Sequence, residues 1–188
     1  MSKSVDTDLP VLQAIKDRWS PRAFDPKPIP EIELQAMLLE ALRWSSSCFN
    51  EQPWQLLITH RGDVRHQVLL DCVSEGNRSW AQQAPVLMLA VARLLFTHNE
   101  KVNRHAGYDL GQAIAQLAIQ ATSRQIYLHQ MGGFSVEAAK EAFGLNQNQE
   151  PYSVIAVGYL GDPDSLTETQ REKELGSRLR RPLDEMLL

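Results

Sequence analysis

One uninterrupted apolar run, residues 86–92, constrains the fold of this chain more than any other feature of its sequence. Pro85 introduces the run, which reads Val-Leu-Met-Leu-Ala-Val-Ala and contains no polar residue. Such a run is typical of a strand that is buried on both faces. It is the longest apolar run in the chain and is far too short to span a bilayer, so we expect no membrane segment.

The rest of the chain alternates between short apolar runs and segments with helical periodicity. Two further strands are predicted at residues 54–59 and 152–160, and prolines keep residues 24–30 extended. Helices are predicted at residues 10–19 with Asp8 as their cap, 31–44, 63–73, 108–128, 135–144 with Ser135 as cap and Gly144 as end, and briefly after residue 162. No internal repeat or low-complexity linker interrupts this pattern. The sequence therefore predicts one α+β domain over residues 1–188.

Two features predict close packing contacts. The long helix predicted at residues 108–128 is rich in glycine and alanine, which would let another helix approach closely. The arm formed by residues 177–188 ends in Met186-Leu187-Leu188, which is apolar enough to dock on a partner.

Composition narrows the class of protein. Among the 188 residues, 43% are hydrophobic and 22% charged, which is typical of a folded globular protein and not of a disordered one. The net charge of -4 argues against a general nucleic-acid binder. Cys48 and Cys72 form no C-x-x-C or metal-finger pair, and residues 1–8 contain no apolar signal core. We therefore expect a cytoplasmic protein in a reducing compartment.

Motifs for side-chain catalysis are absent from the sequence. It contains no phosphate-binding loop, dinucleotide-binding glycine motif, nucleophile elbow or H-E-x-x-H helix. The five histidines show no short metal-ligand spacing, so we expect no metal site. A catalytic function would therefore depend on a bound organic cofactor. Arginine supplies 13 of the 19 basic residues, and its planar fork suits carboxylates and phosphates.

A polar loop is predicted at residues 45–53, between a helix and a strand. Its hydroxyl and amide side chains either present donors to a ligand or cap a turn, and the residues alone leave both interpretations open. Cys48 has no base adjacent in the sequence, which favours an incidental thiol over a nucleophile.

Five segments, in order along the chain, resemble motifs of the FMN-dependent nitroreductase family. They are residues 18–24, similar to R-x-S-x-R-x-F; residues 47–54, similar to S-S-x-N-x-Q-P-W; residues 77–85, similar to N-x-x-W-x-x-x-A-P; residues 129–134, similar to a glycine turn; and residues 178–183, similar to a basic C-terminal arm. Each segment falls on the type of element predicted above. Together they span nearly the whole chain.

The resemblance implies a central, mostly antiparallel sheet flanked by helices, in an intertwined homodimer with two FMN sites at the subunit interface. The arm at residues 177–188 would then reach the partner subunit. The implied activity is an FMN-dependent oxidoreductase that uses NADH or NADPH to reduce nitroaromatic, quinone or similar electron-poor acceptors. Neither nucleic acid nor a membrane is implied as a partner.

The resemblance also implies which residues bind the cofactor. They are Arg18, Trp19, Ser20, Arg22, Ser46, Ser47, Cys48, Asn50, Gln52, Asn77, Gly132, Gly133, Arg178 and Arg180. Among them, Arg18, Arg178 and Arg180 would hold the FMN phosphate with Ser20 as a hydroxyl partner. Arg22 would lie near the pyrimidine edge of the ring and act as an electrostatic tuner of its reduction.

The remaining implied contacts surround the ring. Asn50, Gln52 and Asn77 match residues that hydrogen-bond its polar edge or the ribityl chain. The loop of Ser46, Ser47 and Cys48 would come from the neighbouring subunit. Gly132 and Gly133 match a turn whose backbone approaches flavin N5, where a side chain would obstruct.

Three residues depart from the family pattern. Ser46 stands where the family often has proline, Cys48 where it often has serine, and Gln125 where many members have glycine after the long helix. These departures affect the expected loop shape and substrate preference, and they remove no charge needed by a phosphate.

The resemblance implies a ping-pong reaction with hydride delivered to flavin N5 and no side-chain nucleophile. Alternatives remain open at this point. One is a flavin enzyme of the same fold with another reaction, such as dehalogenation or oxygen-dependent chemistry. Others are a flavin binder without catalysis and a dimeric domain with no cofactor. The sequence does not identify the physiological acceptor, the choice between NADH and NADPH, or whether electrons pass singly or in pairs.

Overall fold

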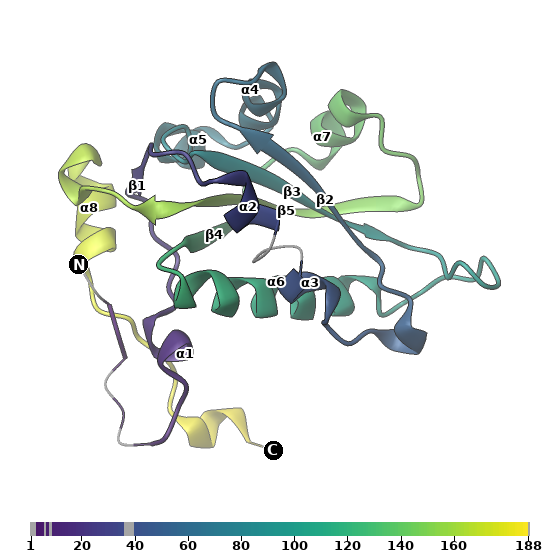
Figure 1. Cartoon of the computed structure of the whole chain (residues 1–188), viewed down its shortest axis with the longest axis horizontal. Helices are drawn as coiled ribbons and strands as arrows, with labels where there is room; N and C mark the ends of the chain where they lie inside the picture. Colours follow the sequence, from purple (N-terminus) through teal and green to yellow (C-terminus); the bar gives the residue numbers. More distant parts are fainter. Residues whose placement is uncertain (1–2, 6, 8, 36–39, 188) are drawn as a thin grey trace.

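A long strand, β5 (Gln149–Leu160), runs through the sheet around which the chain is built (Figure 1). The computed structural model describes residues 3–5, 7, 9–35 and 40–187. The other strands are β1 (Phe24–Asp25), β2 (Trp54–His60), β3 (Val86–Arg93) and β4 (Tyr127–Met131). The sheet has the order β1-β5-β3-β2, and β4 also pairs with β5. All these pairings are antiparallel, as predicted.

Helices cover both faces of this sheet (Figure 1). They are α1 (Gln13–Asp17), α2 (Glu31–Glu33), α3 (Glu40–Arg43), α4 (Val64–Asp71), α5 (Glu75–Ala81), α6 (Ala106–Ser123), α7 (Val136–Phe143) and α8 (Glu168–Leu175). Three short 3-10 turns, η2 (Cys48–Asn50), η3 (Pro163–Ser165) and η4 (Leu183–Met186), complete the described elements. The predicted α+β class, a mostly antiparallel sheet flanked by helices, is confirmed.

Strand β3 explains why the sheet is covered twice. Its residues Val86 to Ala92 are all at most 2% exposed. Val86, Met88, Ala90 and Ala92 pack with α6 in one core cluster. The alternate residues pack in a second cluster on the other face, with α4, α5 and α7. The prediction of a strand buried on both faces is confirmed.

The predicted end of the long helix is wrong. The prediction continued to Leu128, but α6 ends at Ser123, and Tyr127 already belongs to β4. Gln125 adopts a left-handed backbone conformation, with φ of 60°, which ends the helix. The apolar residues that follow are buried in a strand and happen to continue the helical spacing.

Other boundaries differ less. The helix predicted at residues 10–19 is confined to α1, and the predicted cap Asp8 lies outside the described residues. The helix predicted at residues 31–44 is described as α2 and α3, with residues 36–39 between them outside the described part. Helix α5 was not predicted. Helix α7 was predicted with its two ends. The Ser135 side chain accepts a hydrogen bond from the Ala138 N–H, and Gly144 ends the helix with φ of 64°.

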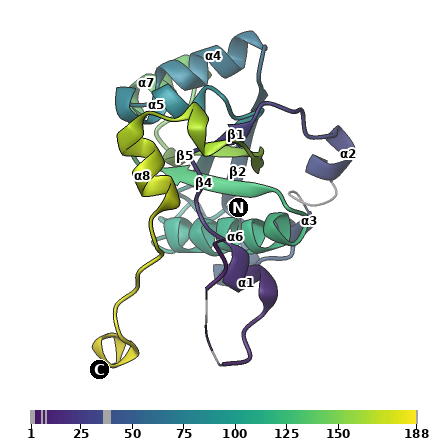
Figure 2. The same ribbon diagram turned by 90° about the vertical axis from the view of Figure 1, so that its left-hand side faces the viewer.

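Figure 2 shows α8 beside the sheet edge and the C-terminal segment leaving the body of the molecule. This segment exposes Leu179, Leu183, Met186 and Leu187. Within the described residues, no helix is both long and apolar enough to cross a membrane.

Candidate functional site

Three arginines from opposite ends of the chain form what we call the arginine cluster: Arg18, Arg178 and Arg180. Burial lowers the pKa of Arg18, and the charge of Arg180 lowers it further. Burial also lowers the pKa of Arg178, with further lowering by Arg18 and Arg180. The three guanidinium groups therefore lie close enough to repel one another. Among the described residues, no carboxylate oxygen lies within 4.0 Å of any of them.

Backbone carbonyl groups bring the cluster together. Arg178 follows α8, and its Nη1 donates hydrogen bonds to the Lys3 carbonyl at 2.9 Å and the Lys16 carbonyl at 2.6 Å. The first bond attaches the start of the C-terminal arm to the N-terminal segment, and the second attaches it to α1, which ends directly before Arg18. Carbonyl oxygens carry no full charge, so these bonds do not neutralise the cluster. The charge of Asp17 raises the pKa of Arg178, an effect smaller than the lowering by Arg18 and Arg180, and Asp17 forms no ion pair with it.

The segment that carries Arg18, Ser20 and Arg22 is fixed from two sides. On one side, the Glu174 carboxylate of α8 is buried and accepts hydrogen bonds from the Arg22 N–H at 2.9 and 3.0 Å and the Ala23 N–H at 3.1 Å. Neither the charged composition of α8 nor its spacing marks Glu174 as a buried residue, and the sequence analysis missed it.

On the other side, His129 of β4 holds the same segment. Its Nδ1 donates to the Pro21 carbonyl at 2.8 Å, and its ring packs against Trp80 with centroids 4.5 Å apart. Burial lowers the pKa of His129 to about 4, and the charge of Arg22 contributes to the lowering. His129 is therefore neutral at pH 7, and Arg22 lies close to it. Sequence reasoning named His129 as part of the glycine turn but gave it no role.

Trp19 lies inside this segment and does not face solvent. It is 8% exposed, and its ring meets Tyr127 edge-on with centroids 6.5 Å apart. The resemblance implied that Trp19 contacts the cofactor. Its ring packs within the chain in this structure, and its contact with the cofactor stays a prediction.

Asn77 and Gly133 come together near the end of β4. The Ser74 N–H donates to the Gly133 carbonyl at 2.9 Å. A Cβ on Gly133 would lie 2.8 Å from Ser74 Oγ and 2.9 Å from Asn77 Nδ2, so a side chain there would require both of these side chains to shift. A Cβ on Gly132 would meet nothing within 4 Å among the described residues. Within this chain a side chain would therefore be crowded at Gly133 but not at Gly132, and the expected approach of both glycines to flavin N5 stays a prediction.

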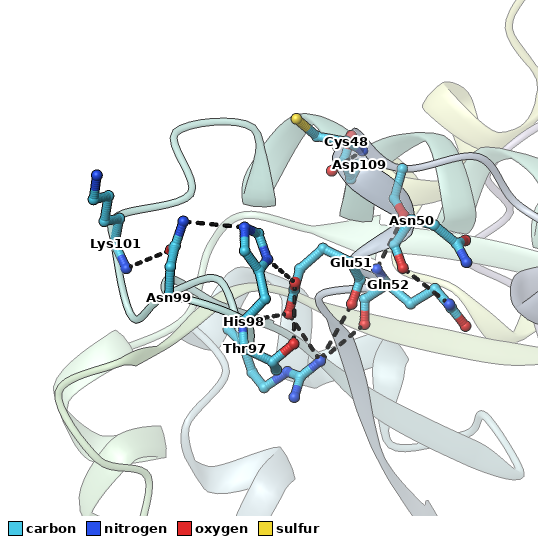
Figure 3. A network of polar contacts seen from close by, with 11 residues as sticks. Cys48, Asn50, Glu51, Gln52, Thr97, His98, Asn99, Lys101 and Asp109 are labelled. Atoms are coloured by element: carbon cyan, nitrogen blue, oxygen red, sulfur yellow. Dashed lines mark hydrogen bonds and ion pairs between the residues drawn. The ribbon is translucent and has the colours of Figure 1, made fainter.

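The remaining sequence-predicted residues lie in the 46–52 loop. Ser46 Oγ donates to Gln112 Oε1 at 3.3 Å, and Ser47 Oγ accepts from the Gln52 N–H at 3.0 Å. The Cys48 N–H donates to the buried Asp109 carboxylate of α6 at 3.0 Å (Figure 3). Asn50 and Gln52 are exposed.

The 46–52 loop and the arginine cluster do not meet within one chain. Asp109 holds the loop at the N-terminal end of α6, whereas α1 and Arg18 lie toward the opposite end (Figure 1). A helix of 18 residues is about 27 Å long. The structure thus places ten of the fourteen sequence-predicted residues in two groups, with Arg18, Ser20, Arg22, Arg178 and Arg180 in one and Ser46, Ser47, Cys48, Asn50 and Gln52 in the other.

The chemistry of the site favours an organic anion over a metal ion. Within the described ranges, no group of three or more histidine, cysteine, aspartate or glutamate side chains is arranged to hold a metal. Both cysteines are free thiols, with Cys72 buried and Cys48 partly exposed. What the arrangement offers is a fixed cluster of positive charge, with amide and backbone groups at the end of a neighbouring strand.

Comparison with known proteins gives a consistent result. The model of the nitroreductase family matches residues 15–159. A solved structure described as an oxidoreductase containing FMN superposes with a TM-score of 0.92 and 30% identity, covering 100% of this chain and 96% of the other. A nitroreductase family protein of Clostridium difficile superposes with a TM-score of 0.72 and 20% identity, covering 93% and 95%, and supports the fold alone.

A curated relative is also similar in sequence. It is the major NAD(P)H-flavin oxidoreductase of Aliivibrio fischeri, which is 37% identical over 121 residues. The match covers 62% of this chain and 52% of that protein.

Proposed function

Because the chain belongs to the nitroreductase family, we propose that it is an FMN-dependent oxidoreductase with NADH or NADPH as its electron donor. The acceptor that we propose is a small electron-poor molecule such as a nitroaromatic or a quinone. When bound, FMN supplies the redox chemistry, taking electrons from the donor and passing them to the acceptor.

The arginine cluster is the observation that carries this proposal. Three guanidinium groups that lower one another's pKa and form no ion pair with a described carboxylate fit a dianionic phosphate, which would relieve the repulsion that Asp17 offsets only at Arg178. FMN carries such a phosphate. We therefore propose that Arg18, Arg178 and Arg180 bind it, with the exposed Ser20 as a hydroxyl donor.

Arg22 and the end of β4 are proposed to serve the ring. The hydrogen bonds from its N–H to Glu174 fix the backbone of Arg22, so that its guanidinium adds a positive charge at a defined place. A positive charge there favours reduction of the ring, because reduction adds negative charge. His129 keeps its proton on Nδ1 and is neutral at pH 7, so it adds no second positive charge beside Arg22. Asn77 and Gly133 would offer an amide and an unobstructed backbone.

We further propose a homodimer in which each subunit supplies the 46–52 loop to the arginine cluster of its partner. The separation of the two groups within one chain supports this arrangement. Large apolar side chains are also exposed around the loop and on the C-terminal arm, including Trp44, Phe49 and Tyr108 beside α6. A dimer would cover such surface. The free thiols support a reducing compartment, and we propose the cytoplasm.

Steady-state kinetics tests the proposed reaction. If donor and acceptor occupy one site in turn, varying both concentrations gives parallel lines in a double-reciprocal plot. Lines that intersect would mean that both substrates bind together, and they would contradict the ping-pong scheme.

A further inference from the structure

Glu51 is a buried acid in the middle of an exposed loop. Its side chain is 3% exposed, whereas its neighbours Asn50 and Gln52 are exposed. The carboxylate accepts hydrogen bonds from the Thr97 N–H at 3.0 Å and the Thr97 hydroxyl at 3.2 Å. Figure 3 shows it pointing away from Asn50 and Gln52 toward Thr97 and His98.

Charge neutralisation explains how this carboxylate is tolerated. Arg93 Nη2 lies 3.6 Å from Glu51 Oε1, and His98 Nδ1 lies 3.9 Å from Oε2. The same Arg93 nitrogen donates to the backbone carbonyls of Glu51 at 3.3 Å and Gln52 at 3.4 Å. Arg93 thus holds both the side chain and the backbone of the loop.

The loop needs such anchoring because its backbone is strained. Phe49, Asn50 and Gln52 have φ of 54°, 55° and 50°. These values lie in the left-handed region, which is unfavourable for most residues other than glycine. Strained residues persist only where their surroundings over-determine the conformation. Glu51 lies between Asn50 and Gln52 and has ordinary helical backbone angles. Its side chain is anchored, whereas the side chains of Asn50 and Gln52 turn outward.

Two partners of Glu51, Thr97 and His98, belong to a second structural unit, the 94–102 hairpin. Leu95 pairs with Val102, and the Phe96 N–H donates to the Lys101 carbonyl at 2.9 Å. Phe96 also meets Phe49 of the loop edge-on, with ring centroids 5.8 Å apart. The loop and the hairpin are therefore joined by a partly buried polar contact and by an aromatic contact.

We propose that Glu51 is a positioning residue for the cofactor site. By attaching the loop to Thr97, it holds the strained backbone that turns Asn50 and Gln52 outward, where the proposed dimer places the partner's ring. This inference rests on the proposed function. Because Arg93 already balances the charge of Glu51, the proposed role of Glu51 is to fix the conformation of the loop and not to supply a charge to the site.

The test uses the full-length protein and the variant Glu51→Gln, which keeps the size of the side chain but replaces a charged acceptor by an amide. We expect the dissociation constants of FMN and riboflavin to rise together, each about tenfold, because the loop acts on the ring and not on the phosphate. Hydrogen exchange of a peptide covering residues 46–53 should be faster in the cofactor-free variant than in the wild type. Glu100→Gln is the matched control, because it removes one negative charge from an exposed position on the same hairpin.

The outcomes separate the inference from the proposed function. Wild-type affinity and wild-type loop exchange in Glu51→Gln would overturn the positioning role, as would a lowered melting temperature with unchanged flavin affinity. Thr97→Val removes one donor to Glu51 and should give a smaller effect in the same direction if Glu51→Gln folds poorly. If the wild type itself binds no FMN, the proposed function fails, and the loop exchange then decides whether Glu51 anchors the loop.

Discussion

Arg18, Arg178 and Arg180 were predictable at the scale of single residues, whereas the side chains that hold them were not. An excess of arginine near both chain ends, together with motif matches, is visible in the sequence. Glu174, His129 and Glu51 are ordinary polar residues until the fold buries them. Their roles depend on partners more than 40 positions away, and no local pattern encodes such pairs.

Replacement of Arg18 tests the proposed phosphate contact. We expect Arg18→Gln to weaken FMN binding about 10-fold to 100-fold, the loss of one charged hydrogen bond, while riboflavin binding stays unchanged. Fluorescence titration of the apoprotein with each flavin measures both constants. Arg181→Gln, an exposed neighbour of the cluster, serves as the control and should bind both flavins like the wild type. An equal loss for FMN and riboflavin in Arg18→Gln would contradict the assignment.

His129 predicts how stability depends on pH. Its pKa is about 4 in the folded protein, below the ordinary value of 6.5, so the unfolded state binds more protons between these values. Its contribution to stability is fully present above pH 6.5 and is lost as the pH falls toward 4. The loss amounts to about 3 kcal/mol at most.

Urea unfolding of the wild type and His129→Gln at pH 7 and pH 5 measures this effect. The variant should lose less stability than the wild type between the two pH values. His66, whose pKa burial also lowers, remains in both proteins and cancels in the comparison. Equal losses in the two proteins would show that His129 is not buried in its neutral form.

At the scale of elements, patterns succeeded where one signal dominated. The apolar run that became β3 and the capping residues of α7 each have a single interpretation. The prediction of the boundary between α6 and β4 failed because the apolar pattern of the helix continues without a break into a buried strand. The helix ends because Gln125 adopts a left-handed backbone conformation, and glutamine is not a residue type that predicts this conformation.

The same position predicts a stabilising substitution. Gln125 has φ of 60°, which is unfavourable for a residue with a Cβ. Gln125→Gly should therefore raise the free energy of unfolding by about 0.5 to 1 kcal/mol. Arg124→Gly, at φ of -106°, should lower it instead. Chemical denaturation of the two variants checks the sign at each position, and a loss of stability in Gln125→Gly would refute the strain argument.

At the scale of the whole molecule, the two groups of proposed site residues lie toward opposite ends of α6. The motif matches gave the residues of both groups in order. The separation of the two groups in space follows from the fold, and it could not be predicted from the order of the motifs in the sequence. The proposed homodimer is the arrangement that unites them.

Mixed dimers test this arrangement. Arg18→Gln and Asn50→Ala each impair a different group, and subunits of the two kinds can be co-expressed with different affinity tags. If the loop acts on the partner's arginine cluster, the mixed dimer has one site with both changes and one with neither. We expect it to bind one FMN per dimer with wild-type affinity. If the loop acted within its own subunit, each site would carry one change and none would bind normally.

An anaerobic visible spectrum of the purified protein, titrated with NADPH and then NADH, tests the central proposal most directly. We predict flavin absorption bands that bleach on addition of at least one donor and return when a nitroaromatic or a quinone is added. A protein that stays colourless after incubation with excess FMN would contradict the assignment of the arginine cluster. Bound flavin that neither donor bleaches would contradict the proposed reaction.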